Sequence, residues 1–188
     1  MAQEAARNDN ERLERAEGYL AAAREHYAFL NRESVESDEP LSYPLSYYVA
    51  GLAVECLFRA YGELVGSKHD AKHDLRRMAE AGRFTEFMLE GDSEPIAEAL
   101  TSVMKRWLNN HRYKSRNALQ RFLNDAELYR TDEGKYLKGN SDAVLRYNWE
   151  RLSKMTAFLL DRGIERWEIS KQKWNRQLHN PSPTHEPN

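Results

Sequence analysis

The segment from residue 45 to residue 65 is apolar on almost every side when it is placed on a helix. Its apolar residues fall on two stripes at helical spacing, namely Leu45, Val49, Leu52, Cys56, Ala60 and Leu64, and Tyr47, Gly51, Val54, Phe58, Tyr61 and Val65. A helix that is apolar around most of its circumference is normally surrounded by other elements. We therefore predict a central helix near 45–65, with Leu52, Cys56 and Ala60 buried.

The rest of the chain shows helical spacing and no strand-like alternation. Start and stop residues, such as Pro95 in a first turn and Gly82 after a last one, divide it into segments. The predicted helices cover residues 13–30, 75–81, 93–107, 115–128, 141–163 and 164–178. The fold class is therefore all-α, a single helical bundle of five to seven helices around the central helix.

The length of 188 residues is typical of one domain, which at this size buries roughly 70% of its unfolded surface. Residues 1–8 are small and polar, and we expect a disordered N-terminus there. The helical domain covers 9–179. Residues 180–188, NPSPTHEPN, form a disordered tail by composition.

The composition excludes several classes of protein. The single cysteine, Cys56, rules out a disulfide framework and a cysteine-rich metal site. No apolar stretch approaches the ~18 residues of a membrane span, and the N-terminus lacks the apolar region of a secretory signal. We expect a cytoplasmic protein with no membrane association, no metal and no cofactor.

The densest basic segment is MKRWLNNHRYKSR, residues 104–116. Its cations, together with the next one along the chain, are Lys105, Arg106, Arg112, Lys114, Arg116 and Arg121. Because the formal net charge is −2, an anion-binding site must be a local patch such as this one. Tyr113 is free to stack on a base, whereas Trp107 falls on the apolar stripe of its helix and is expected in the core.

Within this segment, Arg106 and His111 are candidates for chemistry on a phosphate. An arginine fork binds phosphate bidentately, and a histidine can take a proton from a hydroxyl group such as the RNA 2′-OH. At ~100° per residue, five positions place the two side chains about 140° apart on an unbroken helix. A helix break at Asn109-Asn110 would bring them together. The alternative interpretation is structural: Arg106 pairs with a surface carboxylate and His111 points to solvent.

Two other clusters have both a functional and a structural interpretation. His69 and His73 are spaced to share a metal, but they lack further ligands nearby, so a turn is the expected structure. Glu55, Arg59 and Glu63 lie four residues apart, which favours local ion pairs on the central helix. The functional alternative is that Glu55 lies inside the bundle and orients an arginine from another helix.

The motifs "YYVAGLAVECLFRAY", "KHDLRRMAEAG" and "RWLNNHRY" resemble the HEPN domain superfamily over roughly residues 12 to 160. This all-α superfamily is named for higher eukaryotes and prokaryotes nucleotide-binding. The similarity includes an AxE-like core with a basic residue, here Ala53, Glu55 and Arg59. It also includes a His-Asp-Leu turn, here residues 73–75, that opens the next helix.

The resemblance implies an Arg-x4-6-His site in a homodimeric, metal-independent endoribonuclease of a toxin–antitoxin or phage-defence system. Arg106 would stabilise charge on the phosphate, His111 would act as general base or acid, and Asn110 would position the scissile group. The remaining basic residues and Tyr113 would bind RNA or a nucleotide, with Glu55 and Arg59 in support.

The sequence departs from the catalytic motif at Trp107, where a polar residue usually follows the arginine. The pattern of Trp107, Arg112 and Tyr113 is similar to superfamily members without obvious nuclease activity. The alternative function is therefore a non-catalytic HEPN-like interaction module that docks a protein partner, such as an antitoxin or an effector.

Overall fold

The computed structural model describes residues 2–36, 40, 42–67, 72–137 and 141–179. Its helices in chain order are α1 (Ala2–Glu36), α2 (Tyr43–Leu64), α3 (Leu75–Ala81), α4 (Phe84–Phe87), the 3-10 helix η1 (Glu90–Asp92), α5 (Ser93–Arg106), the 3-10 helix η2 (Asn109–Tyr113), α6 (Arg116–Asp125) and α7 (Ser141–His179). Within these ranges there is no β-strand, only one isolated bridge between Arg130 and Tyr136. The predicted all-α class is confirmed.

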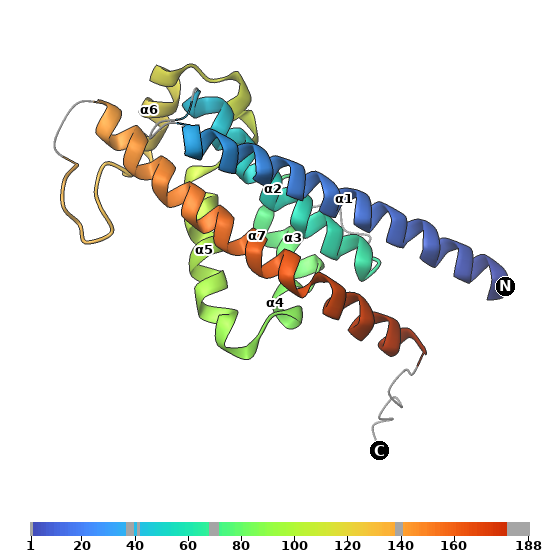
Figure 1. Cartoon of the computed structure of the whole chain (residues 1–188). Helices are drawn as coiled ribbons and strands as arrows, with labels where there is room; N and C mark the ends of the chain where they lie inside the picture. The colour runs from blue at the N-terminus through green and yellow to red at the C-terminus, as the bar shows by residue number, and fades with distance from the viewer. Residues whose placement is uncertain (1, 37–39, 41, 68–71, 138–140, 180–188) are drawn as a thin grey trace.

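Helix α2 is the centre of the bundle, as its all-round apolarity predicted. It packs against α1, α3, α6, α7 and η2 (Figure 1). Cys56 and Ala60 are buried as expected, whereas Leu52 is only partly covered and packs against the edge of the core. The long helices α1 and α7 flank α2, and the N-terminal end of α1 and the C-terminal end of α7 lie on the same side of the molecule (Figure 1).

Local capping residues set several helix ends where the sequence predicted them. The Asp74 carboxylate accepts a hydrogen bond from the Arg77 amide at 3.1 Å at the start of α3, and Gly82 ends that helix. The Ser115 hydroxyl accepts one from the Ala118 amide at 3.2 Å at the start of α6. These bonds satisfy amides that have no partner within their own helix.

Helix α7 differs from its prediction because it continues through Gly163 to His179. A Cβ atom on Gly163 would lie 2.6 Å from a methyl carbon of Leu57, so this glycine allows α7 to approach α2 closely. The Gly163 carbonyl also accepts a hydrogen bond from the Tyr61 hydroxyl at 2.8 Å. At the other end of the chain, the backbone of residues 2–8 is helical where the sequence predicted a loose segment, and residues 180–188 lie outside the described ranges.

The two tryptophans of α7, Trp167 and Trp174, do not form an exposed aromatic patch of the kind that marks a dimer interface. Trp167 is completely buried, and its indole N–H donates to the Glu17 carboxylate of α1 at 3.1 Å. Trp174 is partly buried beneath Arg83, whose guanidinium lies 5.9 Å from the ring centroid. Both residues therefore fasten α7 to the bundle, and the homodimer stays a prediction.

None of the helices in the described part of the chain combines the length and the apolarity that crossing a membrane requires.

Candidate functional site

Arg106 is the last residue of α5 and is buried, with 5% of its surface exposed. Its Nε donates to Asn148 Oδ1 at 3.0 Å, and Nη1 donates to the Ser102 hydroxyl at 2.9 Å and to the Ser102 carbonyl at 3.2 Å. These acceptors are all neutral, and no carboxylate of the described residues lies within ion-pair distance of the guanidinium. Burial lowers the pKa of Arg106 from its ordinary value, and the charge of Asp132 opposes that effect.

Asn148 of α7 fixes the orientation of Arg106. It is completely buried, and its amide nitrogen donates to the Leu128 carbonyl at 2.7 Å and to the Val144 carbonyl at 2.9 Å. Those two bonds leave the amide oxygen directed at Arg106 Nε. One side chain thereby joins α5, α7 and the segment that follows α6, and it holds the guanidinium in one place.

The guanidinium lies in the wall of a groove of about 640 Å³ between α5, α7 and residues 127–132. Four cationic and four acidic side chains line this groove, namely Lys105, Arg106, Arg130, Arg151, Glu94, Glu98, Glu127 and Asp132. Arg151 forms ion pairs through Nη2 with Asp132 and, at 3.7 Å, with Glu98. Its buried Nε has no hydrogen-bond partner among the described residues. The groove therefore offers a fixed cation beside groups that can accept or donate hydrogen bonds.

His111 lies in a different environment, inside the protein. It is 0% exposed and packs edge-on against the rings of Tyr47 and Phe122, at centroid distances of 5.9 and 5.0 Å. Its Nδ1 accepts a hydrogen bond from the Leu108 amide at 3.3 Å, so Nε2 carries the proton, and Nε2 has no partner among the described residues. Burial, and secondarily the charge of Lys114, lowers the pKa of His111 to about 4.

The chain between the two residues explains this separation. Helix α5 ends at Arg106, and Trp107 and Leu108 are extended before η2 begins at Asn109. The break therefore precedes the asparagine pair at which we expected it, and neither asparagine has a left-handed backbone. Trp107 packs on α2 at Gly51, where a Cβ atom would lie 2.1 Å from the ring, and its indole N–H donates to the Tyr48 carbonyl at 3.2 Å.

The structure thus places Arg106 in the groove and His111 in the core, and the groove lining does not include His111. The two side chains share no hydrogen-bond partner among the described residues, so they do not form a pair in this structure. The alternative prediction is also wrong, because Arg106 pairs with no carboxylate of the described residues and His111 does not reach solvent. Asn110 is exposed on η2.

The other predicted basic residues divide between two surfaces. Lys105 lines the groove, whereas Arg112 and Tyr113 form an exposed surface with Tyr48. The Arg112 guanidinium lies 4.7 Å from the Tyr113 ring centroid and 5.4 Å from that of Tyr48, and Nη1 donates to the Tyr48 hydroxyl at 3.0 Å. Tyr113 is 77% exposed, as expected for a residue free to stack. We call Tyr48, Arg112 and Tyr113 the arginine–tyrosine surface.

The last three predicted basic residues belong neither to the groove lining nor to the arginine–tyrosine surface. Lys114 lies 5.7 Å from the Phe122 ring centroid. Arg116 forms an ion pair with Asp142 at 2.8 Å, which neutralises much of its charge. Arg121 is exposed on α6.

Glu55 and Arg59 form the predicted local ion pair on α2, with Nε 3.0 Å from the carboxylate. Glu55 is buried, as the functional alternative required, but its arginine comes from the same helix. The second carboxylate oxygen lies 2.8 Å from His73 Nδ1. Glu63 pairs with Arg15 of α1 at 3.0 Å. The cluster therefore ties α2 to α1 and to the turn before α3.

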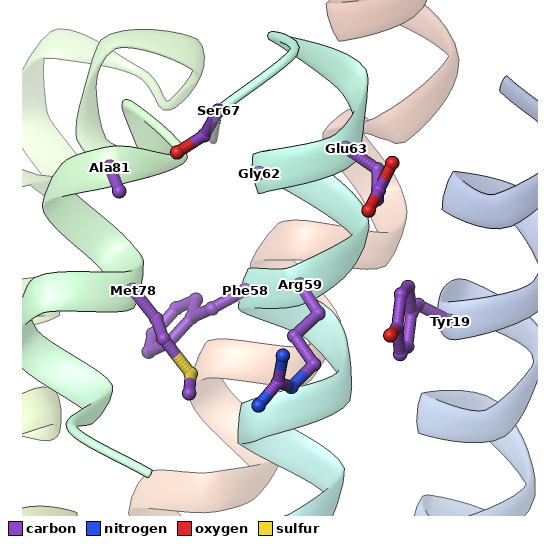
Figure 2. A pocket seen from close by; sticks show the side chains of 8 residues that line it. All are labelled: Tyr19, Phe58, Arg59, Gly62, Glu63, Ser67, Met78 and Ala81. Atoms are coloured by element: carbon purple, nitrogen blue, oxygen red, sulfur yellow. The ribbon is translucent and has the colours of Figure 1, made fainter. Parts of the chain in front are cut away.

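A small pocket of about 60 Å³ adjoins this cluster. Figure 2 shows Arg59 between Tyr19 of α1 and Met78 of α3, with Glu63 one turn further along α2. A water molecule occupies ~30 Å³ in the liquid, so this space suits one or two waters and is too small for a nucleotide.

His73 is the only one of the two metal-ligand candidates that the structure describes, since His69 lies outside the described ranges. Among the residues described, no group of three or more His, Cys, Asp or Glu side chains is arranged to hold a metal ion.

The sequence did not reveal Asn148, Arg130, Asp132 and Arg151 as groove residues. Asn148 had a usable signal, because it is a polar residue beside Trp149 on the apolar side of a predicted helix. The other three lie in a loop and on a polar helix face, and their spacing carries no comparable signal.

No protein-family model, no curated protein and no solved structure matches this chain. The resemblance to the HEPN superfamily therefore rests on the sequence motifs alone.

Proposed function

We propose that this chain is a HEPN-like helical protein that binds RNA or a nucleotide through a phosphate at Arg106, and that it does not use His111 as a catalytic base. The observation that carries the proposal is the buried Arg106 guanidinium at the wall of a groove, whose hydrogen-bond acceptors among the described residues are all neutral.

A buried cation without a carboxylate is a strong anion attractor. The low local dielectric strengthens its interaction with an incoming charge, and the planar guanidinium suits the bidentate geometry of phosphate. Asn148 and Ser102 already fix the side chain, so little of its conformational entropy remains to be lost when a ligand binds. Lys105, exposed at the same groove, adds a second positive charge.

The position of His111 argues for binding without cleavage. A general base must reach the proton that it removes, directly or through one water. His111 has no exposed surface, its ring is enclosed by Tyr47 and Phe122, and its pKa of about 4 keeps it uncharged at neutral pH. The ring thus acts as a core residue.

The test is fluorescence anisotropy with a labelled oligoribonucleotide, in competition with unlabelled nucleotides and inorganic phosphate. We expect Arg106→Gln to weaken binding about tenfold or more, since a hydrogen bond to a charged group contributes ~1.5–3 kcal/mol. Arg121→Gln removes an exposed charge outside the groove lining and should change little. Because Arg106→Gln alters a buried bond, Lys105→Gln serves as a second groove variant. Wild-type affinity in both groove variants would refute the proposal.

The arginine–tyrosine surface supports the second function, docking of a protein partner. Tyrosine and arginine are enriched where interfaces gain most of their energy, and here they are exposed and stacked together. If that function is correct, Arg112→Ala with Tyr113→Ser abolishes capture of an antitoxin or effector partner and leaves nucleotide affinity unchanged.

A further inference from the structure

The charge balance of the groove bears on the size of the phosphate ligand. Its lining contains four cationic and four acidic side chains, so the groove carries no formal excess of positive charge. A strand of RNA brings one negative charge per nucleotide and would meet the carboxylates of Glu94, Glu98 and Glu127 as well as the cations. Strand-binding grooves are instead positively charged along their length.

Beside the groove, Arg130 and two tyrosines that are not part of the lining offer a platform for a base. Arg130 lines the groove, and its guanidinium lies 4.2 Å from the ring centroid of Tyr136 and 5.8 Å from that of Tyr129. The two tyrosine rings are stacked, with centroids 5.9 Å apart and planes 13° apart. Tyr136 remains 60% exposed, so most of its surface is open to a ligand. Aromatic and guanidinium planes are the groups on which nucleic acid bases stack.

The acids of the groove suit the remaining part of a nucleotide. A ribose carries hydroxyl groups and most bases carry amino groups, and both donate hydrogen bonds to carboxylates. Glu98 and Asp132 are partly engaged by Arg151, and Glu94 and Glu127 are exposed in the same lining. A volume of about 640 Å³ also falls within the range of ~300–1,000 Å³ that small-molecule sites occupy.

We infer that the groove binds a single free nucleotide rather than a strand of RNA, with its phosphate at Arg106 and its base at Tyr136 and Arg130. This inference rests on the proposed function and narrows it. The phosphate contacts Arg106, the sugar hydroxyls face the carboxylates of the groove, and the base stacks on Tyr136 beside it.

The experiment is isothermal titration calorimetry on the full chain with the four ribonucleoside monophosphates, the corresponding nucleosides, inorganic phosphate and a short oligoribonucleotide. We expect at least one monophosphate to bind more tightly than its nucleoside and than inorganic phosphate. Its salt dependence should correspond to about one phosphate contact, a log–log slope near one or below. The oligoribonucleotide should gain no affinity from its additional phosphates.

The Tyr136→Ser variant tests the base platform without disturbing a buried residue. We expect it to lower the affinity for the monophosphate roughly five- to hundredfold, the contribution of base–aromatic stacking, and to leave inorganic phosphate unaffected. Tyr113→Ser, the matched change on the arginine–tyrosine surface, should have no effect. Unchanged monophosphate affinity in Tyr136→Ser would overturn the placement of the base.

The two proposals fail in different ways. Tight, steeply salt-dependent binding of the oligoribonucleotide that Arg106→Gln abolishes would overturn the single-nucleotide inference and leave the proposed function standing. If neither the monophosphates nor the oligoribonucleotide bind, both are overturned.

Discussion

Arg106 and His111 lie five residues apart and are both buried, yet their surroundings differ. The groove region surrounds Arg106 with hydrogen-bond acceptors and leaves it at the wall of an open space. His111 instead packs between Tyr47 and Phe122, and its Nε2 has no hydrogen-bond partner in the part of the chain that the structure describes. A motif that joins the two residues in sequence therefore does not join them in space.

The difference arises at Trp107. Its ring occupies the space above Gly51 on α2, so the chain leaves α5 at Arg106 and runs extended past the central helix before η2 begins. With Trp107 docked there, Arg106 lies against α7 and His111 lies in the core.

The largest effect is expected for Gly51→Ala. The added methyl group would lie 2.1 Å from the Trp107 ring, so the indole must move and its bond to Tyr48 is lost. We expect a loss of about 3 kcal/mol in the free energy of unfolding, measured by urea denaturation. Gly18→Ala is the control, because nothing lies within 4 Å of its Cβ, and it should gain about 0.5–1 kcal/mol. Surface substitutions commonly change stability by about 0.5 kcal/mol. A loss in Gly51→Ala no larger than that would show that the packing of Trp107 on Gly51 does not fix the chain at this point.

Acid should lower the free energy of unfolding through His111. The folded state keeps its pKa at about 4, below the ordinary 6.5, so between these values the unfolded chain binds the proton and the folded one does not. Stability is therefore fully present above pH ~6.5 and decreases as pH falls towards 4, by about 2 to 3 kcal/mol at 1.36 kcal/mol per pKa unit.

The measurement is urea denaturation at pH 7 and at pH 4.5. His111→Phe should remove this part of the pH dependence, whereas His26→Gln should remove only the smaller part due to His26, whose pKa is also lowered by burial. An unchanged pH dependence in His111→Phe would show that the histidine is solvated in solution.

Asn148→Ala should destabilise the groove region by about 2 kcal/mol, because it leaves Arg106 Nε and the Leu128 carbonyl without their partners. Thr156→Val is the control on the same helix. The Thr156 hydroxyl is buried without a partner among the described residues, so its removal should be neutral or slightly stabilising. Equal losses in the two variants would mean that Asn148 does not hold Arg106.

The smallest effect is expected in catalysis. RNA incubated in EDTA with wild type or with His111→Phe should stay intact, and both proteins should bind a labelled oligoribonucleotide equally, since His111 is not exposed. Gel electrophoresis reports the first result and anisotropy the second. Cleavage by wild type that His111→Phe abolishes would restore the Arg-x4-His pair as a catalytic site.

Features that depend on neighbours along the chain could be predicted from the amino-acid sequence. The two apolar stripes predicted the central helix, and the end residues of α3 and α6 could be predicted from Asp74, Gly82 and Ser115. Helical periodicity and capping involve residues three or four positions apart, so a single sequence contains the information. The exposure of Tyr113 was predictable for the same reason, since it lies off the apolar stripe.

Features that depend on residues far apart in the chain could not be predicted in this way, because they arise when the helices pack. Gly163 has the appearance of a stop signal, but its contact with Leu57 on α2 makes it a point of close approach inside α7. Arg106 and Asn148 are separated by 42 positions, and only the packing of α5 against α7 makes them partners. The burial of His111 likewise follows from where Trp107 docks on α2. Such contacts depend on how helices pack, and spacing within one helix contains no information about them.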